Sequence, residues 1–307
     1  MTDRRRFLKA GGAALASLAA APLLARTAAT GTPAAVSAAG AIAEAKDFDA
    51  LERISGGRLG VALMDAQGKV IAGHRQDERF PMCSTIKWMI AAAALHRAVG
   101  QPGFLDERLP MRAEDLIDHA PTTRRHVGKD LSVRDLCRTT MVTSDNPAAN
   151  LLLRRLGGPP ALTAFMRSHA DAVTRSDRYE PELNRFTPGD PRDTTSPAAS
   201  AASLQRFVLG DALQPASRQQ LADWLIDNET GDARLRAGLS KAWRVGDKTG
   251  SNGEDTTNDI ALLWPLAGGA PWVLTSYLQG ATVDDAGRND VLRQVAVIAE
   301  GIMQNAG

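Results

Sequence analysis

The sequence predicts an α/β (α+β) protein in which both chain ends build one antiparallel sheet and the middle forms an all-helical domain. Strand patterns occur only near the two ends, at 58–74 and 243–279. Helical patterns dominate the residues between them. With 307 residues, 44% of them hydrophobic, the chain can bury the cores of two such bodies. We therefore expect a sheet flanked by helices, a second helical body, and a functional site at the seam between them.

Each predicted element has a local signal. Residues Ala43–Ile54 can form a helix that two glycines stop. Two alternating segments, Arg58–Asp65 and Val70–His74, flank the turn Ala66–Gly68 and predict a β-hairpin. Residues Ile86–Val99 predict a strongly apolar helix. The later predicted helices are Val133–Val142, Pro147–Leu156, Pro160–His169, Ser196–Leu209, Pro215–Asn228 and Arg288–Met303, and the later strands are Trp243–Thr249, Asn258–Trp264 and Trp272–Gln279.

These elements imply a division into domains. The sheet domain takes residues 43–80 and 228–307, and the helical domain takes residues 81–227. A polar segment with three prolines, Thr174 to Thr195, interrupts the helical domain and predicts a long structured loop. Loops of this length inside a domain are usually functional.

The first 29 residues predict an export signal. Arg4-Arg5-Arg6 precede an apolar, alanine-rich run from Ala10 to Ala25, and small residues follow where a peptidase could cut. Paired arginines before such a run resemble a twin-arginine signal, which implies a periplasmic location. Residues 30–42 then predict a flexible lead-in.

Charge separates the signal from the body. Residues 1–29 hold five basic side chains against Asp3, which leaves 31 basic and 34 acidic side chains, a net charge of −3, on the remainder. A mildly acidic body argues against nucleic-acid binding. No later stretch reaches about 18 uncharged apolar residues, so we expect no stable membrane association after signal removal.

Ser84-Thr-Ile-Lys87 is the first segment that can carry chemistry. A serine hydroxyl needs a base to become a nucleophile, and a lysine three residues later lies on the same helix face. A helix-capping serine with an exposed lysine would give the same pattern. The apolar residues around Ser84 and the scarcity of lysine in this chain favour the catalytic interpretation.

Two further triplets follow in the chain. Ser144-Asp145-Asn146 stands between two predicted helices, where capping alone would also explain it. Lys248-Thr249-Gly250 ends a predicted strand and is followed by Ser251. Each triplet is a weak signal by itself, but their order and combination match the set found in class A β-lactamases and penicillin-binding proteins.

The chain thus resembles a class A serine β-lactamase from about residue 45 to its end, and the twin-arginine start suggests the exported chromosomal cephalosporinase type. The resemblance implies the β-lactamase/transpeptidase-like fold and hydrolysis of penicillins and cephalosporins, which gives antibiotic resistance. The acyl-enzyme forms on Ser84, with Lys87 and Ser144 as further catalytic residues. Whether Lys87 or a loop glutamate is the acylation base stays open.

The long loop supports a β-lactamase over a penicillin-binding protein. Arg178-Tyr-Glu-Pro-Glu-Leu-Asn184 resembles the family's omega loop. By resemblance, Glu180 holds the hydrolytic water, Asn184 binds the same water, and Arg178 pairs with Asp193 to close the neck of the loop.

The resemblance also implies how substrate is held. Backbone N–H groups of Ser84 and Ser251 stabilise the carbonyl oxygen. The remaining substrate-binding residues that it implies are Asn146, Lys248, Thr249, Gly250, Arg234 and, as an aromatic gate, His119. A solvated arginine or a surface histidine would also explain the last two.

We expect free thiols and no cofactor. In many relatives the partner of Cys137 stands where this chain has Ala91. Cys83 stands eight residues before Ala91, roughly 12 Å away along a helix, whereas a disulfide needs Cα atoms within about 7 Å of each other. The bridge that often accompanies carbapenem hydrolysis is also absent, because Ser251-Asn252 follow the Lys-Thr-Gly triplet. The five histidines show no metal-ligand spacing, so we expect no metal.

Four rival functions are open at this point. A zinc hydrolase and an α/β-hydrolase fit poorly, since neither a ligand pattern nor a Gly-x-Ser-x-Gly elbow is present. A D,D-peptidase and a β-lactam sensor domain would both use Ser84 and Lys87, but Glu180 argues against them. We expect a monomer whose partner is a small β-lactam.

Overall fold

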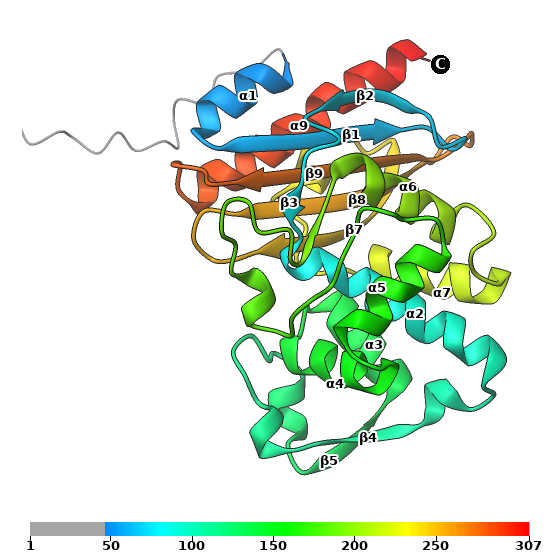
Figure 1. Ribbon diagram of the computed structural model, residues 1–307. Coiled ribbons are helices and arrows are strands. Elements are labelled where there is room, and N and C mark those ends of the chain that lie inside the picture. The colour runs from blue at the N-terminus through cyan, green and yellow to red at the C-terminus, as the bar shows by residue number, and fades with distance from the viewer. Residues whose placement is uncertain (1–46, 307) are drawn as a thin grey trace, which may run out of the picture. The chain divides into compact units, whose positions relative to one another are not determined.

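A five-stranded antiparallel sheet organises the computed structural model, which describes residues 47–306 (Figure 1). The strand order is β2-β1-β9-β8-β7. The first and last parts of the chain meet in its middle, because β1 pairs with β9 from Arg58 opposite Gln279 to Met64 opposite Val273. The strands are β1 (Arg58–Met64), β2 (Val70–His74), β7 (Trp243–Ser251), β8 (Thr257–Pro265) and β9 (Trp272–Gln279). The predicted fold class is therefore confirmed.

Helices cover both faces of the sheet. On one face lie α1 (Phe48–Ser55) and α9 (Asp285–Ala306), and on the other lies α6 (Pro197–Val208) (Figure 1). Strand β1 is accordingly buried along nearly its whole length instead of alternating between buried and exposed residues. The predicted domain boundary assigns α6 to the helical body, but α6 also contacts the sheet, where Tyr277 donates a hydrogen bond to Ser200 Oγ at 2.8 Å.

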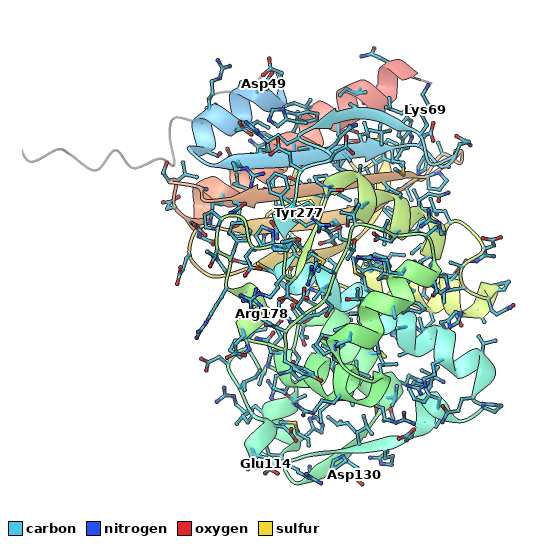
Figure 2. All side chains as sticks on the ribbon, in the orientation of Figure 1. Asp49, Lys69, Glu114, Asp130, Arg178 and Tyr277 are labelled. Carbon is cyan, nitrogen blue, oxygen red and sulfur yellow. The ribbon has the colours of Figure 1, made fainter. Side chains whose placement is uncertain are left out.

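Helix α2 (Lys87–Gly100) is the centre of the helical body. Its residues from Lys87 to Leu95 are all buried, as expected for a helix surrounded by others. It contacts the helices α3 (Val133–Val142), α4 (Asn146–Leu156), α5 (Pro159–Ser168) and α7 (Pro215–Ile226). Side chains fill the space between these helices, and the labelled Glu114 and Asp130 mark the end of the body farthest from the sheet (Figure 2).

Short strand pairs are the elements that the sequence patterns did not predict. Strand β3 (Phe80–Pro81) pairs with β6 (Thr194–Thr195), and β4 (Arg108–Met111) pairs with β5 (Lys129–Ser132). The expectation that all of Thr174–Thr195 is loop was wrong at its last two residues. A two-residue strand exists only through its distant partner and leaves no local periodicity.

The ends of the chain complete the description. Helix α9 begins at Asp285, three residues before the predicted start, and a short helix α8 (Leu235–Gly238) precedes β7. The predicted signal (1–29), the lead-in (30–42) and the first residues of the Ala43–Ile54 helix lie outside the described residues. Within residues 47–306, no helix has the length and apolarity needed to cross a membrane.

Candidate active site

Ser84 lies in a short 3₁₀ helix, Cys83–Ile86, that leads directly into α2. This turn is fixed against the sheet, since Asn258 on β8 donates hydrogen bonds to the carbonyls of Pro81 at 2.8 Å and Met82 at 3.1 Å. Strand β7 approaches equally closely, because a Cβ on Gly250 would lie 2.7 Å from the Met82 carbonyl oxygen and 3.1 Å from the Ser84 nitrogen. Only glycine permits this approach, which brings the amide of Ser84 beside the end of β7.

Lys87 stands one helical turn after Ser84 and is completely buried. Its Nζ donates to Ser84 Oγ at 2.8 Å, to the Ser144 carbonyl at 2.7 Å and to Asn146 Oδ1 at 2.5 Å. Glu180 Oε1 is 3.1 Å away. Burial lowers the pKa of Lys87, and the nearby Glu180 carboxylate opposes this effect. The amine is thus held against the hydroxyl in an environment that favours loss of its proton.

Ser144 joins the two buried lysines. Its backbone has a left-handed φ of 59°, and its Oγ accepts hydrogen bonds from Lys87 at 3.3 Å and from Lys248 at 3.0 Å. Burial and the positive charge of Lys87 lower the pKa of Lys248 to about 7. A hydroxyl between two amines can relay a proton between them or to a bound substrate.

Asp145 explains why this motif needs an acid between Ser144 and Asn146. Its carboxylate caps α4 by accepting from the Ala148 amide at 3.1 Å. It also accepts from the Thr122 and Thr123 amides at 3.1 and 2.9 Å, and from the Thr123 hydroxyl at 2.7 Å. The buried acid therefore fixes the preceding loop to the start of α4.

Glu180 faces the nucleophile from the loop. Its side chain is 0% exposed, and Ser84 Oγ donates to its Oε1 at 3.3 Å. Asn184 Nδ2 donates to Oε2 at 2.6 Å, while Asn184 Oδ1 is buried without a partner. The free oxygen of Asn184 and the carboxylate of Glu180 both suit a water molecule at this point.

The neck of the loop is closed by an ion pair. Arg178 Nε donates to Asp193 Oδ2 at 2.6 Å, and the amides of Asp177 and Arg178 donate to Asp193 Oδ1 at 2.7 and 3.0 Å. Asp193 is buried, and burial raises its pKa. Arg178 is labelled at this loop in Figure 2. The predicted pair of Arg178 and Asp193 is thus in contact.

A cleft of about 380 Å³ opens above these residues. It brings together residues of the loop, the helical body and β7, while Lys87, Lys248 and Glu180 lie buried beside it. The predicted site residues that line it are Ser84, His119, Ser144, Asn146, Asn184, Arg234, Thr249, Gly250 and Ser251.

Arg234 and His119, two further predicted residues, also reach this cleft. Arg234 precedes α8, and it donates through Nε to Asn289 Oδ1 at 2.9 Å and through one terminal nitrogen to the carbonyls of Gly250 and Asn258. His119 has a left-handed φ of 56°, and its Nε2 donates to the Thr143 carbonyl at 3.0 Å. Both side chains therefore have fixed positions at the rim.

Sequence reasoning missed several residues of the site. Thr230 lines the cleft with its hydroxyl 2.5 Å from that of Thr249, and Asn252 and Gly253 extend the rim beyond Ser251. Asn150 accepts from the Glu180 amide and donates to the Glu180 carbonyl, both at 2.9 Å. Its position one helical turn after Asn146 could have indicated it, because residues four apart share a helix face.

Cys83 and Cys137 are both buried free thiols, and burial raises the pKa of each. The part of the chain that the structure describes holds no group of three or more His, Cys, Asp or Glu side chains that could bind a metal ion.

Comparison with known proteins agrees with this geometry. The model of the β-lactamase enzyme family matches residues 44–302. Beta-lactamase L2 of Stenotrophomonas maltophilia is 63% identical over 303 residues, which are 99% of this chain and 100% of that protein. Beta-lactamase CTX-M-25 of Escherichia coli is 46% identical over 82% of this chain and 87% of that protein.

Solved structures give the same result. A crystal structure of L2 complexed with relebactam has a TM-score of 0.83 at 64% identity, covering 87% of this chain and 97% of that one. An ancestral class A β-lactamase has a TM-score of 0.80 at 56% identity, covering 83% of this chain and 97% of that one. The chain therefore belongs to the β-lactamase enzyme family and is a class A serine β-lactamase, a hydrolase of the β-lactam amide bond.

Proposed function

We propose that Ser84 is the nucleophile and Glu180 the deacylating base of this hydrolase, with penicillins and cephalosporins as substrates. One observation carries the proposal: Ser84 Oγ lies between Lys87 Nζ at 2.8 Å and Glu180 Oε1 at 3.3 Å. In acylation, Ser84 Oγ bonds to the lactam carbonyl carbon, the ring C–N bond breaks, and the proton of Ser84 passes to a base. In deacylation, a water molecule gives its proton to Glu180 and its oxygen to the acyl carbon, the bond between that carbon and Ser84 Oγ breaks, and Glu180 returns the proton to Ser84 Oγ.

The leaving nitrogen of the lactam needs a proton, and Ser144 is placed to deliver it. Its hydroxyl contacts both Lys87 and Lys248, so a proton lost by Ser84 can pass through Lys87 and Ser144 to the leaving nitrogen. Each turnover then consumes one water and leaves Ser84, Lys87, Ser144 and Glu180 in their starting protonation states. Either Lys87 or Glu180 can take the first proton, because both lie within reach of Ser84.

The carbonyl oxygen of the substrate is stabilised by the amides of Ser84 and Ser251. The close approach of Gly250 to the Ser84 turn supports this role, since it brings the end of β7 beside the Ser84 amide. Each such donor is typically worth about 3–4 kcal/mol in the transition state.

The substrate carboxylate binds at the other end of the cleft. Ser144, Thr249 and Ser251 offer hydroxyl donors there, and Lys248 and Arg234 supply positive charge. Asn146 and His119 also line the cleft and complete the set of substrate-binding residues. Because the body of the protein carries a net negative charge, these placed cations provide the attraction for an anionic substrate.

Turnover of a chromogenic cephalosporin by the purified protein tests the proposal. We expect many product molecules per enzyme. A single burst of one product per enzyme would instead favour a D,D-peptidase or a sensor domain, which stay acylated. A substrate panel of a penicillin, an oxyimino-cephalosporin and a carbapenem then gives the preferred subclass, for which we expect the carbapenem to be the poorest.

We also propose that residues 1–29 direct twin-arginine export of the folded enzyme to the periplasm, where it works as a monomer. Replacing Arg4 and Arg5 by lysine tests the route, because the pair defines the signal. We expect precursor to accumulate in the cytoplasm, and unchanged export would contradict the route. Light scattering of the mature protein at several concentrations tests the monomer.

A further inference from the structure

Two buried carboxylates, Asp247 on β7 and Asp259 on β8, lie behind the strand that carries Lys248 and Thr249. Both are 0% exposed. The β7–β8 register places Asp259 opposite Thr249. Asp247, two residues before Thr249, therefore projects from the same face of the sheet and is the diagonal neighbour of Asp259.

The two carboxylates differ in their hydrogen bonds. Asp247 accepts from Asn228 Nδ2 at 2.7 Å through one oxygen and pairs with Arg236 through the other. Asp259 accepts only from the Leu235 amide at 3.2 Å, and its Oδ1 is buried without a partner. An ionised carboxylate with one long hydrogen bond and one bare oxygen is costly to bury. Asp247 thus has the partners that a charged group needs, and Asp259 does not.

The charges around Asp259 also favour its protonated form. Asp247 on the same face of β7 and Lys248 on its other face act on it electrostatically, and Arg234 and Arg236 come from the segment that covers this face. Asp285 and Arg288 on α9 pair with each other, and Asp285 also acts on Arg234. Burial, followed by the negative charge of Asp247, raises the pKa of Asp259 well above its ordinary value, while Arg234 and the Leu235 amide oppose the shift.

Arg234 is the group that this arrangement affects. Its hydrogen bonds go to the amide oxygen of Asn289 and to the carbonyls of Gly250 and Asn258. Among residues 47–306 no carboxylate forms an ion pair with it, so its charge is not directly neutralised. An ionised Asp259 would offset this charge from behind the strand.

We propose that Asp259 holds a proton while the enzyme works, and that this proton keeps the positive charge of Arg234 available to the substrate carboxylate. Asp259 is a positioning residue in this account, since it acts through Arg234 and contacts no substrate. The effect on substrate binding rests on the proposed role of Arg234. The presence of the proton on Asp259 does not rest on that role.

The proton can be observed without any activity. In the wild-type enzyme labelled with ¹³C at aspartate carboxyls, we expect one carboxyl signal at the chemical shift of a protonated acid at pH 7. That signal disappears in Asp259→Asn. The proposal is overturned if every wild-type aspartate signal lies at the ionised position, or if the protonated signal persists in the variant. The wild-type spectrum remains decisive even where the variant folds poorly.

The effect on binding is read from KM. We expect the ratio of wild-type KM to Asp259→Asn KM for a carboxylate-bearing cephalosporin to rise at least about threefold over the pH range in which the protonated ¹³C signal of Asp259 disappears, because only the wild type gains a charge opposing Arg234. Titration of Lys248 affects both proteins and cancels in the ratio. A ratio that stays constant while the protonated ¹³C signal of Asp259 disappears means that the charge of Asp259 does not act on Arg234 and contradicts the inference.

Asp285→Asn is the matched control. Asp285 is another carboxylate that affects Arg234, but its side chain is 69% exposed. Its substitution should leave the pH dependence of KM as in the wild type. If the ratio of wild-type KM to Asp285→Asn KM rises as much with pH as the ratio for Asp259→Asn, the assignment to Asp259 is overturned. Absence of turnover in all three proteins would instead contradict the proposed function and leave the spectroscopic result standing.

Discussion

Lys87 Nζ and Glu180 Oε1 lie 3.1 Å apart with both side chains completely withdrawn from solvent. Ser84 Oγ is within hydrogen-bonding distance of each. A buried amine and a buried acid on either side of one hydroxyl can each exchange a proton with it directly. The class A fold reaches this arrangement by placing Lys87 on the central helix and Glu180 on a loop that an ion pair closes.

Lys248 should give the enzyme a pH dependence in the neutral range. Burial and the nearby Lys87 lower the pKa of Lys248 to about 7, so the ammonium form prevails below this pH and is lost above it. We expect KM for a carboxylate-bearing cephalosporin to rise as the pH increases through about 7. Lys248→Arg should remove this rise, because a guanidinium stays charged.

Lys241→Arg is the control for this pH profile, since Lys241 is exposed. The KM of Lys241→Arg should rise with pH as it does in the wild type. A Lys248→Arg enzyme whose KM still rises through neutral pH would show that another group causes the change.

Arg178→Ala should open the neck of the loop and destabilise the protein. The substitution leaves the carboxylate of Asp193, with a side chain only 1% exposed, without its cation. Breaking one partner of a buried pair typically costs about 3–5 kcal/mol, and the remaining backbone donors to Asp193 place the expected loss toward the lower end. Urea unfolding measures the loss, and kcat should fall because Glu180 is less well held.

The Arg192–Asp190 pair in the same loop provides a comparison for that result. Arg192 is 52% exposed, and pairs of this kind contribute little. The free energy of unfolding of Arg192→Ala in urea should therefore be close to that of the wild type. Equal losses in the two arginine variants would mean that the neck pair has no special role.

Asn150→Ala should impair deacylation although Asn150 does not line the cleft. Its amide clamps the backbone of Glu180 from both sides, so its loss leaves a buried N–H and a buried C=O unpaired at a typical cost of about 1–3 kcal/mol for each group. We expect kcat to fall and acyl-enzyme to accumulate. Asn150→Asp, which keeps the acceptor for the Glu180 amide, should recover part of the rate. Full activity in Asn150→Ala would remove Asn150 from the site.

Both cysteines should be inert in the folded enzyme. Cys83 and Cys137 are 0% exposed, and burial raises the pKa of each thiol, so little thiolate forms at neutral pH. Iodoacetamide should modify neither residue in the native state and both after unfolding. A mass two hydrogens lower than that of the reduced chain would reveal a disulfide and contradict this prediction.

The strands and long helices were predictable from the sequence because their periodicity is local. Predicted and observed bounds coincide for α3, whose apolar residues follow the helical pattern, and for β9, whose apolar residues are interrupted only by Thr275 and Ser276. The β3–β6 and β4–β5 pairs escaped prediction because their hydrogen bonds join segments far apart in sequence. Local patterns hold no information about such partners.

The site residues likewise divide into those that a sequence motif reveals and those that only the fold reveals. Ser84, Lys87, Ser144 and Lys248 were found because their motifs have fixed spacing and order. Asn150 and Thr230 carry no motif, and they matter only because folding brings them against Glu180 and Thr249. The raised pKa of Asp259 was equally hidden, since it arises from burial beside Asp247 and not from any sequence pattern.

Intact mass spectrometry of Glu180→Gln with a cephalosporin tests the central claim most directly. Glu182→Gln, an exposed glutamate in the same loop, is the control. We predict that Glu180→Gln gains one substrate-derived adduct that persists and maps to the peptide containing Ser84, while the wild type and Glu182→Gln return to their free mass. An adduct on another residue, or a Glu180→Gln enzyme that deacylates as fast as the wild type, would contradict the assignment of Ser84 and Glu180.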